Sequence, residues 1–364
     1  MPEQLRSGIL GTGFMGSVHA QAVLSNGGVV AAILGSSTAS SERGAQMYPG
    51  ARAVSSIDEM VAAGVDVIHV CTPNALHREQ AEAAIAAGVP VICEKPLATS
   101  SSDARALVES AAAKDLLTAI PFVYRYYPMV LDIRERIATR DGGGLWLLHG
   151  SYLQDWLSDS AATNWRVEPG RGGASRAFGD IGVHWCDLME FVTGQRIVRV
   201  HAALGRAFER QGGQAQNATE DGGVISFETD GGAMGSLVIS QASAGRRNRL
   251  WFSFDGPEES YSFDQEAPET AWIGRAGANL LVSRDPSVQS GDASRANALP
   301  GGHPQGYQTC FNDLVGDVYA AIRGQGRSDV LPSFADGLRA AHITEAVVAS
   351  SRTRTWVDVD RHTN

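Results

Sequence analysis

The stretch Gly8-Ile9-Leu10-Gly11-Thr12-Gly13-Phe14-Met15-Gly16 decides the fold of the first part of this chain. Its first three residues are typical of a short buried strand, and residues 17–24 after it are typical of a helix. A strand, a glycine turn and a helix in this order predict a dinucleotide-binding unit. Gly11 permits the tight turn, Gly13 lets the backbone approach a pyrophosphate, and Gly16 lets the helix pack closely on the strand.

The beginning of this predicted helix is suited to phosphate binding. Free backbone N–H groups and the positive end of the helix dipole gather at a helix N-terminus. The pattern G-x-G-x-x-G is weak by itself in a chain with 41 glycines, but its place between a strand and a helix makes it specific. The residues expected to contact the cofactor here are Gly11, Gly13, Phe14, Met15 and Gly16.

Two patterns divide the chain. Apolar runs at residues 29–34, 65–71, 89–93 and 116–122 alternate with helix-like segments, which predicts βαβ units and a parallel sheet. Later strands alternate apolar and polar residues and are joined by hairpin signals such as Asp230-Gly231-Gly232, which predicts an antiparallel sheet with one open face. We therefore predict an α/β protein with a dinucleotide-binding domain over 1–124 and a second domain over 125–364, in which residues 287–302 form a loop.

The composition limits the class of protein. A length of 364 residues favours two domains, and 43% hydrophobic with 19% charged residues is typical of a soluble globular protein. The net charge of −10 disfavours nucleic acid and anionic membranes as partners. Four scattered cysteines without a C-x-x-C pair favour a reducing compartment. With no signal peptide or transmembrane-length run in the sequence, we expect a cytoplasmic protein.

Two motifs follow predicted parallel strands at the edge of the sheet where ligands bind. In Glu94-Lys95-Pro96, the proline restricts Lys95 to an extended conformation and so orients its side chain. Either this lysine stabilises a developing alkoxide or it is a solvated residue at the end of the strand. The segment Thr72-Pro73-Asn74, with His77 after it, either lies beside the nicotinamide of a cofactor or is a simple turn.

A third motif, Asp180-Ile181-Gly182-Val183-His184-Trp185-Cys186-Asp187, opens a predicted helix. The spacing places Asp180, His184 and Asp187 on one helical face. A carboxylate one turn from an imidazole fixes its tautomer and raises its pKa, which suits a general acid or base that moves a hydroxyl proton. The alternative is an N-cap aspartate with an incidental histidine. No third ligand is placed by spacing, so we predict no metal site.

Together these motifs resemble the glucose–fructose oxidoreductase / inositol dehydrogenase family, also written Gfo/Idh/MocA. The resemblance lies in the order and spacing of Gly11-x-Gly13-x-x-Gly16, Thr72-Pro73-Asn74-x-x-His77, Glu94-Lys95-Pro96 and Asp180-x-Gly182-x-His184-x-x-Asp187. It implies a Rossmann domain followed by an α/β domain with a large, mostly antiparallel open sheet. That sheet is expected to form homodimers or homotetramers.

The resemblance also implies an activity and a set of site residues. The reaction is a hydride transfer between NAD or NADP and a secondary alcohol or ketone carbon of a sugar, anhydrosugar or cyclitol. Lys95 contacts the reacting oxygen, His184 accepts the proton, and Asp180 binds substrate or tunes His184. Further similarity is to a sugar-dehydrogenase branch, and the expected substrate-binding residues are Tyr124, Arg125, Gln154, Asp155, Trp165, Arg166, Asp180, His184 and His303. Several of these residues are equally compatible with a structural role.

The chain departs from the usual NAD pattern after its second strand. NAD enzymes place a carboxylate there for the ribose 2′-hydroxyl, whereas this chain has Gly35-Ser36-Ser37-Thr38. Because Ser36 and Ser37 leave room for a 2′-phosphate, the sequence leans weakly to NADP. Two other classes stay open: a glycosidase that uses bound NAD transiently, and a non-catalytic sensor of dinucleotide or sugar. The intact Lys95, Asp180 and His184 disfavour the sensor.

Overall fold

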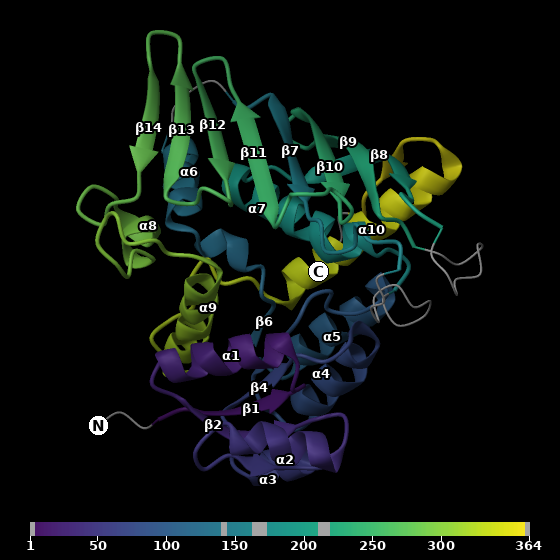
Figure 1. The fold of residues 1–364 in the computed structure, drawn as a ribbon, viewed down its shortest axis with the longest axis vertical. Coiled ribbons are helices and arrows are strands. Elements are labelled where there is room, and N and C mark those ends of the chain that lie inside the picture. The colour runs from purple at the N-terminus through teal and green to yellow at the C-terminus, as the bar shows by residue number, and fades with distance from the viewer. Residues whose placement is uncertain (1–3, 140–143, 162–172, 210–218, 361–364) are drawn as a thin grey trace. The chain divides into compact units, whose positions relative to one another are not determined.

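A computed structural model of the protein describes residues 4–139, 144–161, 173–209 and 219–360 (Figure 1). These residues form two compact units, each with its own sheet. The first unit contains residues 4–123 and Tyr307–Leu338, and the second contains Tyr124–Gly306 and the described residues from Arg339 onward. The division after Val123 lies one residue before the predicted position.

The placement of Tyr307–Leu338 in the first unit differs from the predicted second domain of 125–364. The reason is a set of contacts between residues far apart in the sequence, which a local sequence pattern does not predict. The Tyr319 hydroxyl lies 2.9 Å from the Ser7 hydroxyl, and the Asn26 amide donates to the Asn312 carbonyl at 2.8 Å. Through these contacts a late helix packs against the beginning of the chain.

The first unit contains a six-stranded parallel sheet of order β3-β2-β1-β4-β5-β6. The strand order reverses between β1 and β4, which makes their carboxyl ends the expected ligand-binding edge. The strands are β1 (Arg6–Leu10), β2 (Val29–Leu34), β3 (Arg52–Ala53), β4 (Val67–Val70), β5 (Val91–Cys93) and β6 (Thr118–Ala119).

Three helices of this unit begin directly after a serine that caps them. Ser37, Ser56 and Ser100 each accept a hydrogen bond from a backbone N–H in the first turn of the helix that follows, and each such cap contributes about 1 kcal/mol to helix stability. The helices are α1 (Phe14–Ser25), α2 (Thr38–Gln46), α3 (Ile57–Ala62), α4 (His77–Ala86), α5 (Ser101–Ala113) and α9 (Tyr307–Ile322). Helix α10 (Phe334–Thr353) begins here and continues in the second unit.

The second unit contains a nine-stranded sheet of order β14-β13-β12-β11-β7-β10-β9-β8-β15. All neighbours are antiparallel except β7 and β10, which confirms the mostly antiparallel prediction. The strands are β7 (Leu147–Leu153), β8 (Ile197–Gly205), β9 (Gly222–Thr229), β10 (Met234–Ser240), β11 (Arg249–Asp255), β12 (Glu259–Asp264), β13 (Thr270–Arg275), β14 (Asn279–Ser283) and β15 (Val357–Asp358).

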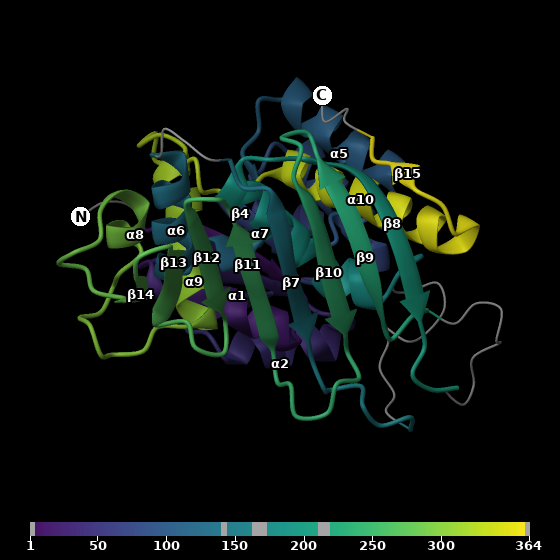
Figure 2. The same ribbon diagram turned by 90° about the horizontal axis from the view of Figure 1, so that it is seen from above.

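Helices cover one face of this sheet. Helix α6 (Pro128–Ala138) packs on β12 and β13, and α7 (Val183–Thr193) packs on β7. Figure 2 shows the strands in front and α6, α7 and α10 behind them, so the near face of the sheet is open. The short helix α8 (Gly291–Arg295) lies within residues 287–302, which corrects the prediction that this whole segment is a loop.

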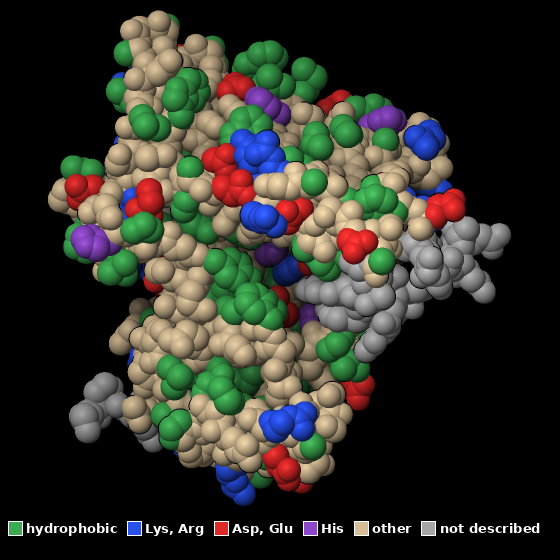
Figure 3. Space-filling model, in the orientation of Figure 1, with side chains coloured by type: hydrophobic (Ala, Val, Ile, Leu, Met, Phe, Trp, Pro, Cys, Tyr) green, Lys and Arg blue, Asp and Glu red, His purple; other side chains and the backbone are tan. Residues whose placement is uncertain are grey.

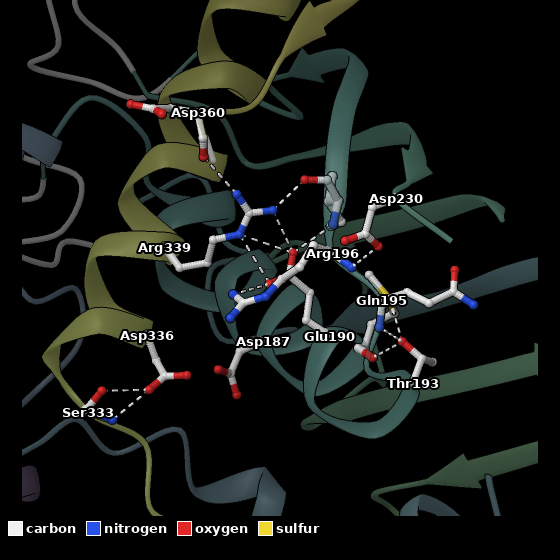
Figure 4. A network of polar contacts seen from close by, with 12 residues as sticks. Asp187, Glu190, Thr193, Gln195, Arg196, Asp230, Ser333, Asp336, Arg339 and Asp360 are labelled. Atoms are coloured by element: carbon white, nitrogen blue, oxygen red, sulfur yellow. Dashed lines mark hydrogen bonds and ion pairs between the residues drawn. The ribbon is translucent and has the colours of Figure 1, made fainter. Parts of the chain in front are cut away.

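An ion pair anchors α7 to α10 and to β8 (Figure 4). Arg339 Nη2 donates to Glu190 at 2.8 Å, and its Nε lies 3.2 Å from both carboxylate oxygens. Glu190 also accepts from the backbone N–H of Ile197 at 2.8 Å, and Arg339 donates to the Asp360 carbonyl at 2.9 Å. Both side chains are over nine-tenths buried. Removal of either partner would leave the other charge buried without compensation.

We predict that Glu190→Leu and Arg339→Met each lower the free energy of unfolding by about 3–5 kcal/mol. Urea denaturation followed by circular dichroism measures the change. The control is Arg196→Ala, because Arg196 also contacts Glu190, at 3.1 Å, but is half exposed. Its expected cost is below about 1 kcal/mol. Equal losses in the three variants would contradict the assignment.

Candidate active site

The glycine loop after β1 has the geometry that a dinucleotide requires. Gly11 has a φ of +100°, and a Cβ atom there would lie 2.5 Å from the Cys71 carbonyl oxygen. A Cβ atom at residue 16 would lie 2.1 Å from the Gly11 carbonyl oxygen, whereas one at Gly13 would meet nothing within 4 Å. Gly11 and Gly16 are thus required by the fold, and the space beside Gly13 is what a close phosphate needs.

Helix α1 begins at Phe14, directly after this loop, so its free N–H groups point toward that space. Phe14 is 73% exposed and Met15 is half-buried. An exposed phenylalanine beside an open glycine loop is available to contact a bound dinucleotide. A cofactor-binding role for these residues stays a prediction.

His77 joins the loops after β4 and β5. It is fully buried, and its two ring nitrogens lie 2.7 Å from the Pro96 carbonyl oxygen and 2.8 Å from the Thr72 carbonyl oxygen. Burial lowers the pKa of His77, although both carbonyl contacts act in the opposite direction. The ring holds the two loops together, while Thr72, Pro73 and Asn74 remain half-buried at the strand ends.

Lys95 follows β5 and is half-buried. Its backbone N–H donates to Glu94 Oε2 at 3.2 Å, and the Lys95–Pro96 peptide bond is cis. The Glu94 carboxylate is buried, and its Oε1 lies 3.0 Å from His19 Nε2. The backbone on both sides of Lys95 is therefore held, by Glu94 before it and by His77 at Pro96.

The segment after β2 carries small hydroxyl residues. Ser36 and Ser37 are exposed, and the Ser37 hydroxyl accepts from the Ser40 backbone N–H at 3.2 Å. The Gly35 N–H donates to the Ser41 hydroxyl at 2.9 Å. The segment thus presents hydroxyl groups rather than a carboxylate at the strand end.

In the second unit, α7 is preceded by a π-helical turn, Phe178–Gly182, of the kind often found at functional sites. Asp180 lies in this turn and accepts from the Gln241 side chain at 2.7 Å. His184 lies in the first turn of α7 and is 8% exposed. Its ring meets the Tyr124 ring edge-on at 5.0 Å between centroids.

Asp187 and Arg125 hold each other. The Arg125 guanidinium donates to both Asp187 oxygens, at 2.9 and 2.5 Å, and stacks 4.8 Å from the Phe191 ring centroid. Both side chains are over nine-tenths buried. This bidentate pair fixes the segment that carries Tyr124 against α7.

A hydrogen-bonded cluster forms beside His184. The Tyr124 and Tyr152 hydroxyls lie 2.5 Å apart, and Asn248 accepts from Tyr152 at 2.8 Å and donates to Tyr124 at 3.1 Å. The Gln154 amide also donates to Asn248, at 2.7 Å. The structure therefore brings together three of the residues predicted to bind substrate, Tyr124, Gln154 and His184.

Other predicted substrate residues lie apart from this cluster or outside the description. Asp155 accepts from the Gly245 N–H at 3.2 Å and from Arg247 at 2.9 Å. His303 is exposed. The buried Arg284 donates hydrogen bonds to backbone carbonyls of the same segment, including the His303 carbonyl at 2.6 Å. Trp165 and Arg166 lie outside the described residues.

Sequence reasoning missed Asn248 and Gln241. Each lies just outside a strand, where polar residues are ordinary, so no local signal marks them. Tyr152 was also not among the predicted substrate contacts. Only the pairing of β7 with β10 and β11 brings these side chains beside Tyr124 and Asp180.

Three further observations concern surface charge, metal ligands and helix hydropathy. On the face shown in Figure 3, acidic and basic side chains of the described residues are interspersed rather than gathered into one broad basic surface. Within the described ranges, no group of three or more His, Cys, Asp or Glu side chains is arranged to hold a metal ion. In the same ranges no helix combines the length and hydropathy needed to cross a membrane.

The comparison with protein families covers both units. Residues 5–121 match the model of an oxidoreductase family with an NAD-binding Rossmann fold, and residues 130–261 match the model of the GFO/IDH/MocA C-terminal domain.

Individual proteins similar to this chain come from the same family. Levoglucosan dehydrogenase from Pseudarthrobacter phenanthrenivorans is 29% identical over 325 residues, covering 81% of this chain and 80% of that protein. Inositol 2-dehydrogenase from Cereibacter sphaeroides is 32% identical over 207 residues, covering 56% of this chain and 58% of that protein. A levoglucosan dehydrogenase structure with NADH and L-sorbose superposes with a TM-score of 0.90 at 27% identity, covering 99% of this chain and 100% of that one. The chain therefore belongs to the Gfo/Idh/MocA family of NAD-binding oxidoreductases.

Proposed function

We propose that this protein is a dehydrogenase or reductase that transfers a hydride between a nicotinamide cofactor and a secondary carbon of a sugar, anhydrosugar or cyclitol. The observation that carries the proposal is the cluster around His184, where two tyrosine hydroxyls, Asn248 and Gln154 supply paired donors and acceptors. Polyols require such pairing, because a buried hydroxyl without a partner costs binding free energy. Named relatives that act on levoglucosan and inositol support this substrate class.

The residues then take the following roles. His184 accepts the hydroxyl proton in the oxidation direction, and Asp180 in the preceding turn orients substrate or tunes that imidazole. Lys95 donates a hydrogen bond to the reacting oxygen and stabilises the developing alkoxide. The glycine loop, Phe14, Met15, Thr72, Pro73 and Asn74 hold the cofactor, which supplies or accepts the hydride when bound.

We predict that Lys95→Ala lowers kcat about 10²-fold to 10³-fold, because one donor to the developing oxyanion is lost. The measurement is nicotinamide absorbance with a panel of hexoses, anhydrosugars, glycosides and inositols. Lys114→Ala is the matched control, since Lys114 is the other lysine of the chain and donates to the Ala86 carbonyl at 2.6 Å. NADH binding, followed by fluorescence, should persist in both variants. Near-wild-type turnover of Lys95→Ala would contradict the role proposed for Lys95.

The same panel separates the other two classes. A glycosidase with transient redox would cleave a glycoside without net change in cofactor absorbance. A sensor would bind dinucleotide or sugar without turnover of any panel member. Net reduction of the cofactor by one member supports the dehydrogenase.

The cofactor we propose is NAD. The lean toward NADP is not supported by the comparisons, because the matching family model is NAD-binding and solved structures of levoglucosan dehydrogenase with NADH are among the similar ones. Ser36 and Ser37 leave room for the ribose 2′-hydroxyl of NAD. The carboxylate that usually accepts a hydrogen bond from this hydroxyl has no counterpart at these two positions.

We predict a higher kcat/KM with NAD than with NADP, and a wider gap in Ser36→Asp. A carboxylate there would accept from the 2′-hydroxyl and repel a 2′-phosphate, which should lower kcat/KM for NADP at least about tenfold. Ser36→Ala is the control and should leave the ratio nearly unchanged. Preference of the wild type for NADP would refute the choice of cofactor.

We also propose that the open face of the nine-stranded sheet joins copies of this chain. Strand register places Val224, Val238, Ser151 and Trp251 in one row across β9, β10, β7 and β11. Val224 and Val238 are 51% and 41% exposed, and Trp272 further along the sheet is 37% exposed. Exposed apolar side chains gathered on the open face of a sheet mark interaction surfaces.

We predict that Val238→Asp shifts the assembly toward monomer, because the new charge would be buried without a partner. Sedimentation equilibrium measures the mass, with Val288→Asp as control, since Val288 is 74% exposed and lies outside the sheet. A wild type that is monomeric at micromolar concentration contradicts the proposal.

A cytoplasmic location is also proposed. The four free cysteines support it, because free thiols are typical of a reducing compartment.

A further inference from the structure

A chain of buried polar groups crosses the first unit behind Lys95. His19 Nε2 lies 3.0 Å from Glu94 Oε1, and His19 Nδ1 lies 3.0 Å from His69 Nδ1. His69 Nε2 lies 3.3 Å from the Ser7 hydroxyl, which lies 2.9 Å from the Tyr319 hydroxyl. We call these groups the histidine chain. They come from α1, β4, β1, α9 and the loop after β5.

The histidine chain is enclosed in the core. His19, His69 and Ser7 are fully buried, and Glu94 is 7% exposed. A buried polar group must be hydrogen-bonded or it destabilises the fold by about 1–3 kcal/mol. The positions of the hydrogens in the chain are therefore restricted by the partners available to each atom.

Two neutral histidines satisfy the arrangement. Burial and the neighbouring His19 lower the pKa of His69 well below its usual value, so His69 is neutral. Between two facing Nδ1 atoms one nitrogen donates and the other accepts. With both rings neutral they are opposite tautomers, and the position of one hydrogen decides both.

The ends of the chain determine the direction. An ionised Glu94 only accepts, so His19 carries its hydrogen on Nε2 and accepts at Nδ1. His69 then donates from Nδ1 and accepts at Nε2 from the Ser7 hydroxyl, which accepts from Tyr319. In the reverse direction the Tyr319 hydroxyl hydrogen would have no acceptor among the described residues, since its hydrogen bond there is to Ser7.

Every hydrogen of the chain thus points toward Glu94. Hydrogen bonds aligned in this way polarise one another and strengthen the last of them. The other carboxylate oxygen of Glu94 accepts from the Lys95 backbone N–H at 3.2 Å. The histidine chain is thereby linked to the backbone of the residue expected to contact the reacting oxygen.

We propose that His19 and His69 are positioning residues: the histidine chain orients the Glu94 carboxylate and through it fixes the backbone of Lys95 for hydride transfer. This role rests on the proposed function for its catalytic part. The tautomer assignment rests on the hydrogen-bond geometry together with the neutral state of the buried His69. The two parts have separate tests.

The first test uses nitrogen-15 NMR of histidine-labelled protein without substrate. Ring nitrogens with and without a hydrogen have well-separated shifts, and His19→Gln and His69→Asn assign the two rings. We expect the hydrogen on Nε2 of His19 and on Nδ1 of His69. Two identical tautomers, or a charged ring at neutral pH, would overturn the assignment whatever the enzyme does.

The second test compares matched substitutions. In His19→Gln the amide nitrogen can donate to Glu94 while the amide oxygen accepts from His69, whereas His19→Leu removes both hydrogen bonds. Likewise His69→Asn retains a donor to His19 and His69→Leu does not. We expect the leucine variants to lose about 10-fold to 100-fold in kcat, the equivalent of one hydrogen bond to a charged group, and the amide variants to stay within a few-fold of wild type.

Two readings besides kcat separate positioning from simple destabilisation. The NADH dissociation constant should change little in all four variants, and the thermal midpoint shows whether each is folded. Equal loss of kcat in the leucine and amide variants, or full activity of the folded leucine variants, would overturn the positioning role. If the wild type turns over no panel substrate, the proposed function fails while the NMR result still decides the tautomers.

Discussion

The absence of a side chain at residue 16 is the constraint on which the first unit depends. A Cβ atom there would lie 2.1 Å from the Gly11 carbonyl oxygen, so only glycine lets α1 lie this close to the loop after β1. The close approach aims the N-terminus of α1 at the space beside Gly13. It also brings His19, one helical turn further on, into the core beside His69 and Glu94.

The second unit depends on buried ion pairs that hold α7 in place. Helix α7 carries Asp187 and Glu190, which pair with Arg125 and Arg339. These two pairs secure the helix at separate points along its length, and each is over nine-tenths buried. His184 lies in the first turn of this helix and Asp180 lies in the π-helical turn before it, so both are carried by a segment that these ion pairs hold in place.

Several residues have other partners than their motifs suggested. His77 was expected beside the cofactor, and its ring contacts two backbone carbonyls in the core. Arg125 was expected to contact substrate, and its guanidinium is bound to Asp187. His69 carries no motif in the sequence, yet it lies at the centre of the histidine chain. A motif identifies which residues matter at a position, but the partner of a side chain depends on what the fold places beside it.

The sequence by itself determined the strand–turn–helix order, the glycine loop, the change from parallel to antiparallel pairing near residue 125, and the segments that carry Lys95 and His184. These features depend on backbone sterics and on periodicity among near neighbours, which are local. Only the tertiary structure decided that Tyr307–Leu338 joins the first unit, that Asn248 meets Tyr124 across 124 residues, and that His19 meets Glu94 across 75. Such pairs depend on helix and strand packing between distant segments, and no local pattern encodes which distant side chain will fill a given space.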